Sequence, residues 1–242
     1  MTVARLIDVS VQRSARNADR ELTNVSMSFP EGKFSAILGP NGSSKSLLME
    51  VLGGLASVDS GQVFTCGVEL TALAPQNRTR LLSESVAFVF NEHNVIRSLT
   101  FDDNLLLAHK FSRRPVDREL YRDVVESFGL APYLGMKPSP ETTDINQRLA
   151  IARAVLKKAK LVLACEPTQF LQHKPSENVL DSLRRCSREY GMSIILSTHS
   201  NFVATYADEV HVFLDGAPTG SVVNPSLPSL AFAQENITYS AR

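Results

Sequence analysis

A glycine-rich turn between an apolar run and an amphipathic segment constrains this chain most. Residues 34–38 lead straight into Gly39-Pro-Asn-Gly42, and residues 46–55 then place apolar side chains on one helical face. This order predicts a buried strand, a tight turn and a helix. The whole run Gly39-Pro-Asn-Gly42-Ser-Ser-Lys45-Ser46 nearly matches the phosphate-loop pattern G-x-x-x-x-G-K-[ST], in the context that the pattern requires. The backbone N–H groups of such a loop and the start of its helix favour a bound anion.

The loop predicts a nucleotide phosphate site with a role for each polar residue. Lys45 would neutralise the β and γ phosphates, and the Ser46 hydroxyl would ligate Mg²⁺. Ser44 stands where the pattern has its second glycine, so its Cβ would crowd the phosphates or, at a positive φ, strain the backbone by about 1–2 kcal/mol. We therefore expect weakened binding. A glycine-rich turn without a ligand is the alternative, which the neighbouring motifs disfavour. The predicted nucleotide-binding residues are Gly39, Pro40, Asn41, Gly42, Ser43, Ser44, Lys45, Ser46 and Leu47.

The remaining pattern predicts an α/β fold. Residues 3–11 and 23–29 alternate apolar and polar side chains, as half-buried strands do. Helices are expected at 146–158 and 176–189, and residues 98–135 read as mostly helical with a loop at 112–116. Strands alternating with helices imply a mostly parallel sheet whose ligands lie at the carboxyl ends of its strands. The further apolar strands are expected at residues 85–90, 161–164, 193–197 and 211–214.

Composition narrows the classes of function. The 242 residues suit one large α/β domain or two small ones, and 25 basic residues balance 25 acidic ones. Such a chain has no global field that draws it to nucleic acid or to an anionic membrane. Three cysteines without paired or metal-like spacing favour a reducing compartment. No stretch reaches the ~20 apolar residues of a membrane helix, and the first residues are too polar for a signal peptide. We expect a cytosolic chain that reaches a membrane only through a partner.

Four segments resemble the nucleotide-binding domain of the ABC transporter family. They read LTNVSMSFPEGKFSAILGPNGSSKSLL, NEHNVIRSLTFDDNLLLA, QRLAIARAVLKKAKLVLACEPT and LSTHS. The branch most similar drives lipoprotein release, macrolide export and cell-division complexes. The resemblance implies a P-loop fold with a mostly parallel core sheet, an N-terminal antiparallel β layer and a helical subdomain at about 95–140. The ABC-type domain would occupy residues 1–220, with a C-terminal tail at 221–242.

The resemblance assigns roles to residues outside the loop. Glu166 lies where the family keeps the carboxylate that polarises the attacking water, and His199 lies where it keeps the histidine that contacts the γ-phosphate. Alone, Glu166 would be read as a surface carboxylate and His199 as a structural histidine. Their joint spacing to Lys45 argues against coincidence.

Several family positions are altered. Cys165 replaces the aspartate of the Mg²⁺ shell, although magnesium prefers hard oxygen ligands. Asn91 replaces the glutamine that reaches Mg²⁺ and is one methylene shorter, so Ser46 and Asn91 would bind the metal only weakly. Gln172 replaces the D-loop aspartate. The adenine-stacking aromatic has no counterpart in residues 11–15.

The signature sequence departs most. The family motif L-S-G-G-Q is replaced by Glu141, Thr142, Thr143, Asp144 and Ile145. In the family this motif opens a helix and offers bare N–H groups to the γ-phosphate on a partner domain. We expect Asp144 to be the N-cap of its own helix and to occupy that anion site. Two like charges ~4 Å apart at an effective dielectric near 20 cost about 4 kcal/mol, so the partner's nucleotide would be repelled.

The expected function is therefore that of a degenerate ATP-binding subunit. ABC domains pair head to tail, and these substitutions affect both composite sites. We expect weak binding of ATP and Mg²⁺, little hydrolysis, and a structural or regulatory role beside transmembrane permease subunits and a second ATPase domain. A competent ATPase is the main alternative, since Glu166 and His199 are retained. A soluble non-transport ABC protein acting on DNA or ribosomes is disfavoured by the neutral charge and single domain.

Overall fold

The computed structural model describes residues 1–12, 21–92, 94–112 and 115–240. These residues form a six-stranded sheet, ordered β10-β9-β3-β8-β7-β6, and a four-stranded sheet, ordered β2-β1-β4-β5. In the larger sheet β3 pairs in parallel with β8 and β9, and β7 pairs in parallel with β8 and β6, whereas β10 is antiparallel to β9. The smaller sheet is antiparallel. The predicted α/β class, with its parallel core sheet and antiparallel layer, is confirmed.

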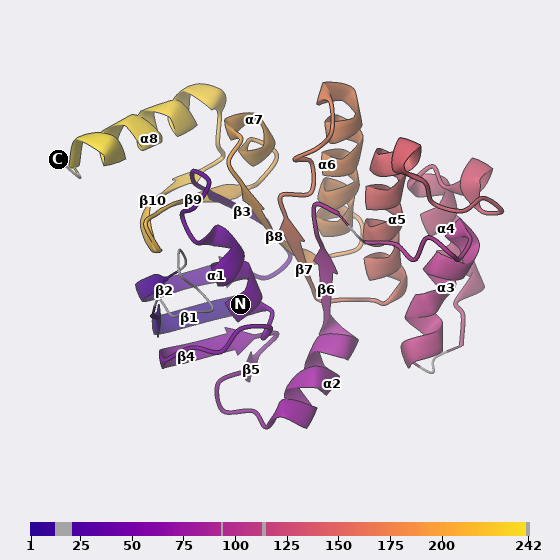
Figure 1. Ribbon diagram of the computed structural model, residues 1–242, viewed down its shortest axis with the longest axis horizontal. Coiled ribbons are helices and arrows are strands. Elements are labelled where there is room, and N and C mark those ends of the chain that lie inside the picture. Colours follow the sequence, from indigo (N-terminus) through magenta and orange to yellow (C-terminus); the bar gives the residue numbers. More distant parts are fainter. Residues whose placement is uncertain (13–20, 93, 113–114, 241–242) are drawn as a thin grey trace.

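The strands range from 2 to 10 residues in length, and most of the helices lie around the larger sheet (Figure 1). The strands are β1 (Thr2–Val11), β2 (Leu22–Pro30), β3 (Phe34–Leu38), β4 (Ser60–Thr65), β5 (Val68–Glu69), β6 (Val86–Val89), β7 (Leu161–Cys165), β8 (Ser193–Thr198), β9 (Glu209–Leu214) and β10 (Ala217–Val223). The helices are α1 (Lys45–Leu52), α2 (Pro75–Ser85), α3 (Phe101–Ser112), α4 (Arg118–Ser127), α5 (Thr143–Leu156), α6 (His173–Arg188), α7 (Asn201–Ala204) and α8 (Leu227–Ser240), with 3₁₀ turns η1 (Ala131–Tyr133) and η2 (Pro140–Thr142).

The larger sheet is buried on both faces, and alternate residues of one strand enter different clusters. Ala36 and Leu38 pack with buried residues of α3, α5 and α6. Ile37 between them packs instead with α1 and the antiparallel layer. This division follows from the two-residue period of a strand. It explains why residues 34–38 read as a continuous apolar run, as expected of a strand covered on both sides.

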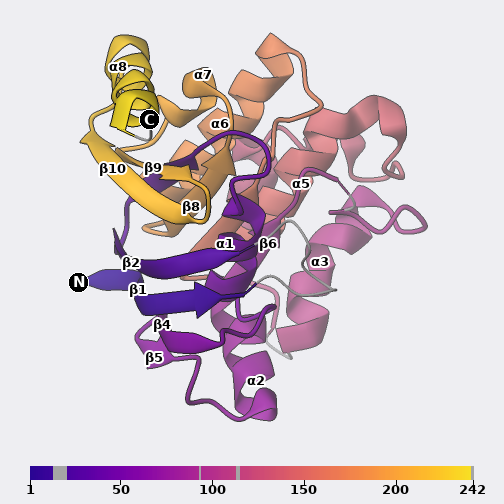
Figure 2. The ribbon, with the colours of Figure 1, turned by 60° about the vertical axis from the view of Figure 1, so that its left-hand side comes forward.

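The helical region of residues 98–135 resolves into two helices beyond the β6 edge of the sheet (Figures 1 and 2). Helix α3 ends at Ser112 and α4 begins at Arg118, so the expected loop at 112–116 falls between them, with residues 113–114 outside the described ranges. Asp117 caps α4 by accepting a hydrogen bond from the Leu120 N–H. Within the described part of the chain, no helix is both long and apolar enough to cross a membrane.

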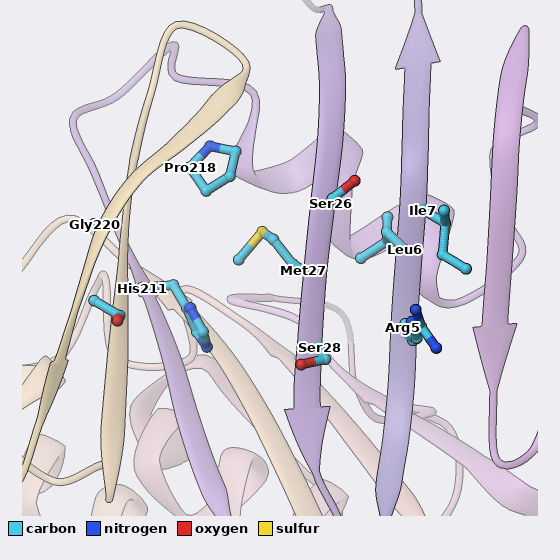
Figure 3. Close-up of a pocket in the computed structure, with 10 residues that line it drawn as sticks. Arg5, Leu6, Ile7, Ser26, Met27, Ser28, His211, Pro218 and Gly220 are labelled. Carbon is cyan, nitrogen blue, oxygen red and sulfur yellow. The ribbon is translucent and has the colours of Figure 1, made fainter.

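The two sheets meet at a groove beside β2 and β10. It encloses about 470 Å³. In Figure 3 the side chains of Met27 and His211 lie between these two strands, with Arg5 on the far side of β2. The His211 ring meets Phe29 edge-on at 5.1 Å between centroids, and its Nε2 lies 3.3 Å from Glu209 Oε1. His211 thus joins the antiparallel layer to the core sheet.

Candidate functional site

The glycine-rich turn lies at the carboxyl end of β3, between that strand and α1. The Gly39 N–H donates to the Thr198 carbonyl at 3.1 Å, which ties the turn to the end of β8. A Cβ on Gly39 would lie 2.0 Å from the Phe213 carbonyl oxygen, so only glycine fits there. Gly42 has a φ of 83°, a left-handed conformation that glycine adopts without strain. The first turn of α1, described in full, contains no acidic residue. The turn therefore places an uncompensated helix start at the edge where ligands of parallel sheets bind.

Ser44, which stands where the pattern has its second glycine, adopts a left-handed backbone conformation. Its φ is 67° and its ψ is 14°, a left-handed geometry that costs a residue with a Cβ about 1–2 kcal/mol. Its side chain is buried and turned into the protein, where the hydroxyl accepts a hydrogen bond from the Glu21 N–H at 3.1 Å. This bond ties the loop to the chain entering β2 and offsets part of the strain.

Lys45 is folded back onto its own loop. Its Nζ donates to the carbonyls of Gly39 at 2.7 Å and Pro40 at 2.8 Å, and the residue is 6% exposed. Burial lowers the pKa of Lys45, and the Glu166 carboxylate, with Oε1 3.9 Å from Nζ, opposes that shift. A phosphate would thus replace neutral carbonyl partners of this ammonium with charged ones, which form stronger hydrogen bonds.

Glu166 and His199 meet at the ends of β7 and β8. Glu166 follows β7 with a φ of 44°, and its N–H donates to the Ser197 carbonyl at 3.0 Å. Its Oε2 lies 3.1 Å from His199 Nδ1. Its Oε1 is buried and has no hydrogen-bond partner among the described residues. A cavity of about 480 Å³ opens beside the pair, with Thr168 and Ser200 in its lining. The turn before α1 and the ends of β7 and β8 thus bring together Lys45, Glu166 and His199, the residues to which the sequence assigned the chemistry.

Cys165 ends β7 as a neutral thiol. Burial raises the pKa of Cys165 to about 12, and the nearby carboxylates of Glu50 and Glu166 add to the shift. A protonated sulfur is a poor ligand for Mg²⁺, which prefers hard oxygen donors. The position that resembles the family's metal-shell aspartate therefore offers neither charge nor oxygen.

Asn91 is engaged with a residue that the sequence analysis did not single out. Its Nδ2 donates to Gln169 Oε1 at 3.0 Å, across 78 positions of the chain. Ser46, on the first turn of α1, is exposed. In the described residues, no cluster of three or more His, Cys, Asp or Glu side chains could hold a metal. The Ser46 hydroxyl and the Asn91 side-chain oxygen, which the bond from Nδ2 does not engage, are the residues that would hold Mg²⁺, and the neutral thiol at 165 adds no oxygen donor.

The main chain of the Asn91 loop is held in place by the buried side-chain amide of Gln147. Gln147 of α5 is 2% exposed, and its Nε2 donates to the carbonyls of Phe90 at 2.9 Å and Asn91 at 2.7 Å. The side-chain oxygen of Gln147, Oε1, accepts a hydrogen bond from Asn94 Nδ2 at 2.7 Å. Gln147 belongs to one of the segments that resemble the ABC family. A single glutamine in a helical sequence does not reveal that it will bond to Phe90, Asn91 and Asn94.

The start of α5 contradicts one prediction. Asp144 is not the N-cap, because Thr142 holds that position and Asp144 lies in the first turn. The reason is the preceding 3₁₀ turn, in which the Ser139 N–H donates to Thr142 Oγ1 at 3.1 Å. Because of this turn, α5 begins at Thr143, one residue before Asp144. The Asp144 carboxylate instead lies 3.4 Å from Arg148, one turn along, which also donates to the Phe128 carbonyl at 2.7 Å.

The other altered positions are placed as follows. Ile145 packs into the core, Glu141 is exposed, and Thr143 donates its hydroxyl to the Pro140 carbonyl at 2.6 Å. Gln172 is the N-cap of α6, where no side-chain capping bond is found in the described structure. Of the stretch at 11–15, where the adenine-stacking aromatic has no counterpart, residues 13–15 lie outside the described residues.

Comparisons with known proteins agree with this arrangement. The family model for the ABC transporter matches residues 22–169. A macrolide export ATP-binding/permease protein MacB of Neisseria gonorrhoeae is 33% identical over 219 residues, which are 89% of this chain and 34% of that protein. The MacB of Aggregatibacter actinomycetemcomitans is 33% identical over 197 residues, 81% of this chain and 30% of that protein. The chain thus spans about a third of the length of the curated relatives that it matches.

Solved structures show the same fold. The dimeric post-hydrolysis state of the ATP-binding cassette MJ0796, bound to ADP and phosphate, superposes with a TM-score of 0.78 at 25% identity, covering 92% of this chain and 99% of that one. The cbiO1 structure from Clostridium perfringens gives a TM-score of 0.82 at 20% identity, covering 99% of this chain and 94% of that one. With its phosphate loop, its sheet order and these matches, the chain belongs to the ABC transporter family.

Proposed function

We propose that this chain is an ATP-binding subunit of an ABC-type membrane transporter complex that binds nucleotide weakly and hydrolyses it poorly or not at all. One contrast carries the proposal. Lys45 and the start of α1 retain the groups that would bind phosphate, whereas Cys165 offers no oxygen for the Mg²⁺ shell and Asn91 is one methylene shorter than the family's glutamine. Its role in the complex is structural or regulatory.

The binding step follows from the loop itself. Phosphate oxygens would take the Lys45 ammonium from the carbonyls of Gly39 and Pro40, while the N–H groups at the start of α1 would bind the phosphate charge that Lys45 leaves unbalanced. In this step the two carbonyl bonds of Lys45 would have to be broken, and the Cβ of Ser44 would crowd the phosphates. These two costs support weak rather than tight binding.

The partners are proposed from the relatives. The curated relatives are named as ATP-binding and permease proteins, and the cassette MJ0796 is described as dimeric. We infer that this chain joins transmembrane permease subunits at the cytoplasmic face of the membrane and pairs with a second ABC ATPase domain, identical or different. Nucleic acid is not among the proposed partners, because 25 basic and 25 acidic residues cancel.

A competent ATPase that powers transport remains the second candidate, because one contact favours it. Glu166 Oε2 lies 3.1 Å from His199 Nδ1, which is a hydrogen-bonding distance. Such a bond would orient Glu166 as a general base and His199 beside it. In that case Glu166 would accept the proton of the attacking water and His199 would contact the γ-phosphate. Turnover by the purified chain separates the two candidates.

The binding proposal is tested by titrating a fluorescent ATP analogue onto the wild type and Lys45→Ala. Loss of charge-assisted hydrogen bonds of about 1.5–3 kcal/mol each predicts binding weaker by roughly 10–100-fold. Lys137→Ala, at an exposed lysine, is the matched control and should bind as the wild type does. Equal affinities of the wild type and Lys45→Ala would contradict the proposal.

A further inference from the structure

The side of helix α1 that is not buried consists of two polar residues. Of the eight residues of this helix, all of them described, only Ser46 and Glu50 are not buried. Because residues four apart lie on the same face of a helix, these two are neighbours along that side. Helical side chains lean toward the N-terminus, which brings a carboxylate at position 50 toward the turn that carries Ser46. A carboxylate thus accompanies the hydroxyl that would bind Mg²⁺.

Glu50 also lies near the strand whose metal-shell position is altered. Leu161, Leu163 and Cys165 alternate along β7 and pack with the cluster that contains α1, whereas the residues between them enter the other cluster. The Cys165 side chain therefore faces the α1 side of the sheet. The Glu50 carboxylate is close enough to raise the pKa of the Cys165 thiol, as the largest cause of that shift after burial. Glu50 and Cys165 are thus near one another between helix and strand.

The Glu50 carboxylate makes up for the charge that is absent at position 165. The family's aspartate would place one carboxylate on the strand, whereas here the strand carries a neutral thiol and the neighbouring helix carries the carboxylate. An aspartate at 165 together with Glu50 would put two like charges close together, which is unfavourable. Glu166 is also close to Cys165, but it lies 3.9 Å from Lys45 and 3.1 Å from His199. Of these two carboxylates, Glu50 is the one on the helix with the metal-binding hydroxyl.

We propose that Glu50 is the carboxylate that supports Mg²⁺ at this site, in place of the family's aspartate at position 165. The Ser46 hydroxyl and the Asn91 side-chain oxygen would hold the ion with the phosphates, and Glu50 contributes the negative charge and the hard oxygen atoms that Mg²⁺ prefers. Glu50 acts through the metal and is therefore a positioning residue. The inference rests on the proposed function, because it concerns the metal that accompanies nucleotide in the same loop.

The experiment titrates a fluorescent ATP analogue onto the purified full chain, once in excess EDTA and once in excess Mg²⁺. The wild type should bind more tightly in Mg²⁺, and Glu50→Gln should reduce this gain roughly tenfold or more, the usual effect of removing a group that supports a metal. In EDTA the variant should bind at least as tightly as the wild type, which also shows that it is folded. The same Mg²⁺ gain in both proteins, or no gain in the wild type, would overturn the inference.

Two further variants and a direct view of the metal serve as controls. Glu84→Gln makes the same change at an exposed carboxylate of α2 and should keep the full Mg²⁺ gain. Electron paramagnetic resonance of Mn²⁺ added with ATP should show weaker metal binding by Glu50→Gln, and unchanged Mn²⁺ binding would count against the inference. Lys45→Ala tests the proposed function separately, because undiminished binding by that variant in EDTA would show that the loop is not the site.

A rescue variant tests whether charge is the cause. Glu50→Gln with Cys165→Asp moves the carboxylate back to the strand and should restore the Mg²⁺ gain. The matched control is Glu50→Gln with Cys165→Asn, which has the same shape without the charge and should not restore it. Among variants that still bind in EDTA, restoration by both or by neither would show that the loss in Glu50→Gln does not come from the missing charge. Either result would contradict the assignment to Glu50.

Discussion

Helices α1 and α5 both begin at positions where the family binds phosphate, but this chain treats the two helix starts differently. At α1 a glycine-rich turn leads into the helix, the N-cap Ser44 makes no side-chain capping bond in the described structure, and Lys45 donates to main-chain carbonyls. At α5 a 3₁₀ turn precedes the helix, and in this turn the Thr142 hydroxyl accepts a hydrogen bond from the Ser139 N–H. Asp144 lies in the first turn of α5.

The difference indicates that a helix start becomes an anion site only when its backbone N–H groups are accessible and no negative side chain offsets its positive charge. The start of α1 meets both conditions, since Lys45 adds a positive charge and no acidic residue occupies its fully described first turn. At the start of α5 the Thr142 and Thr143 hydroxyls donate to the Ser139 and Pro140 carbonyls, and Asp144 adds a negative charge that would meet a phosphate as like charge. We therefore expect the chain to keep its own nucleotide site and to lose the one that it would offer to a partner.

The largest effect is expected from rebuilding the start of α5. Thr143→Gly with Asp144→Gly, in a Cys165→Asp and Glu166→Gln background, should strengthen ATP-dependent dimers by at least roughly tenfold, or ~1.4 kcal/mol. Glycine lets a phosphate approach the backbone, and removal of Asp144 ends the like-charge repulsion. Because Arg148 lies 3.4 Å from that carboxylate, the gain stays below the ~4 kcal/mol of an uncompensated pair.

Analytical ultracentrifugation with Mg-ATP measures these dimers. The background variant with Thr143 and Asp144 intact is the control and should stay monomeric. Tight dimers in that control would mean that another contact replaces the signature and that the electrostatic account of Asp144 is wrong.

The sequence predicted the α1 side of this comparison and missed part of the α5 side. Residues 34–46 carry their own signals, because the apolar strand, the glycine turn and Lys45 are adjacent. The position of Asp144 depends on the Ser139–Thr142 contact, which a single candidate capping residue in the sequence does not reveal. The Asn91–Gln169 link joins residues 78 positions apart and has no local pattern at all.

Whole elements were missed for a related reason. None of the described residues of α2 is buried, so it shows no apolar stripe. Strand β10 forms an edge of the sheet with mostly exposed or half-buried residues, and α8 follows it in a stretch that the sequence left unassigned. Periodicity detects elements that bury a face, and these elements bury little.

A smaller effect is expected at Ser44. Ser44→Gly relieves a left-handed backbone strain of about 1–2 kcal/mol but loses the bond from Glu21, which contributes about 0.5–1.5 kcal/mol. We expect a net stabilisation of up to about 1 kcal/mol and tighter nucleotide binding. Urea unfolding and the ATP titration measure these two effects. Weaker nucleotide binding by the glycine variant would show that Ser44 helps to hold the phosphates.

The smallest effect is expected from the charge of Asp144 on folding. Asp144→Asn removes a half-buried i,i+4 pair with Arg148 and a carboxylate at a helix start, so stability should fall by about 0.5–1 kcal/mol. Glu84→Gln breaks the exposed pair of the same spacing with Arg80 and should change stability by less than about 0.5 kcal/mol. If urea unfolding showed that Asp144→Asn stabilises the fold, the Asp144 carboxylate would be strained by repulsion rather than paired.

The central claim, that nucleotide binding survives where hydrolysis does not, is tested most directly by steady-state phosphate release. The purified wild type is compared with Glu166→Gln at an ATP concentration that saturates binding. The account predicts release near background in both, because Cys165 and Asn91 no longer support the chemistry that Glu166 would perform. Sustained release by the wild type that Glu166→Gln abolishes would contradict it and establish a competent ATPase.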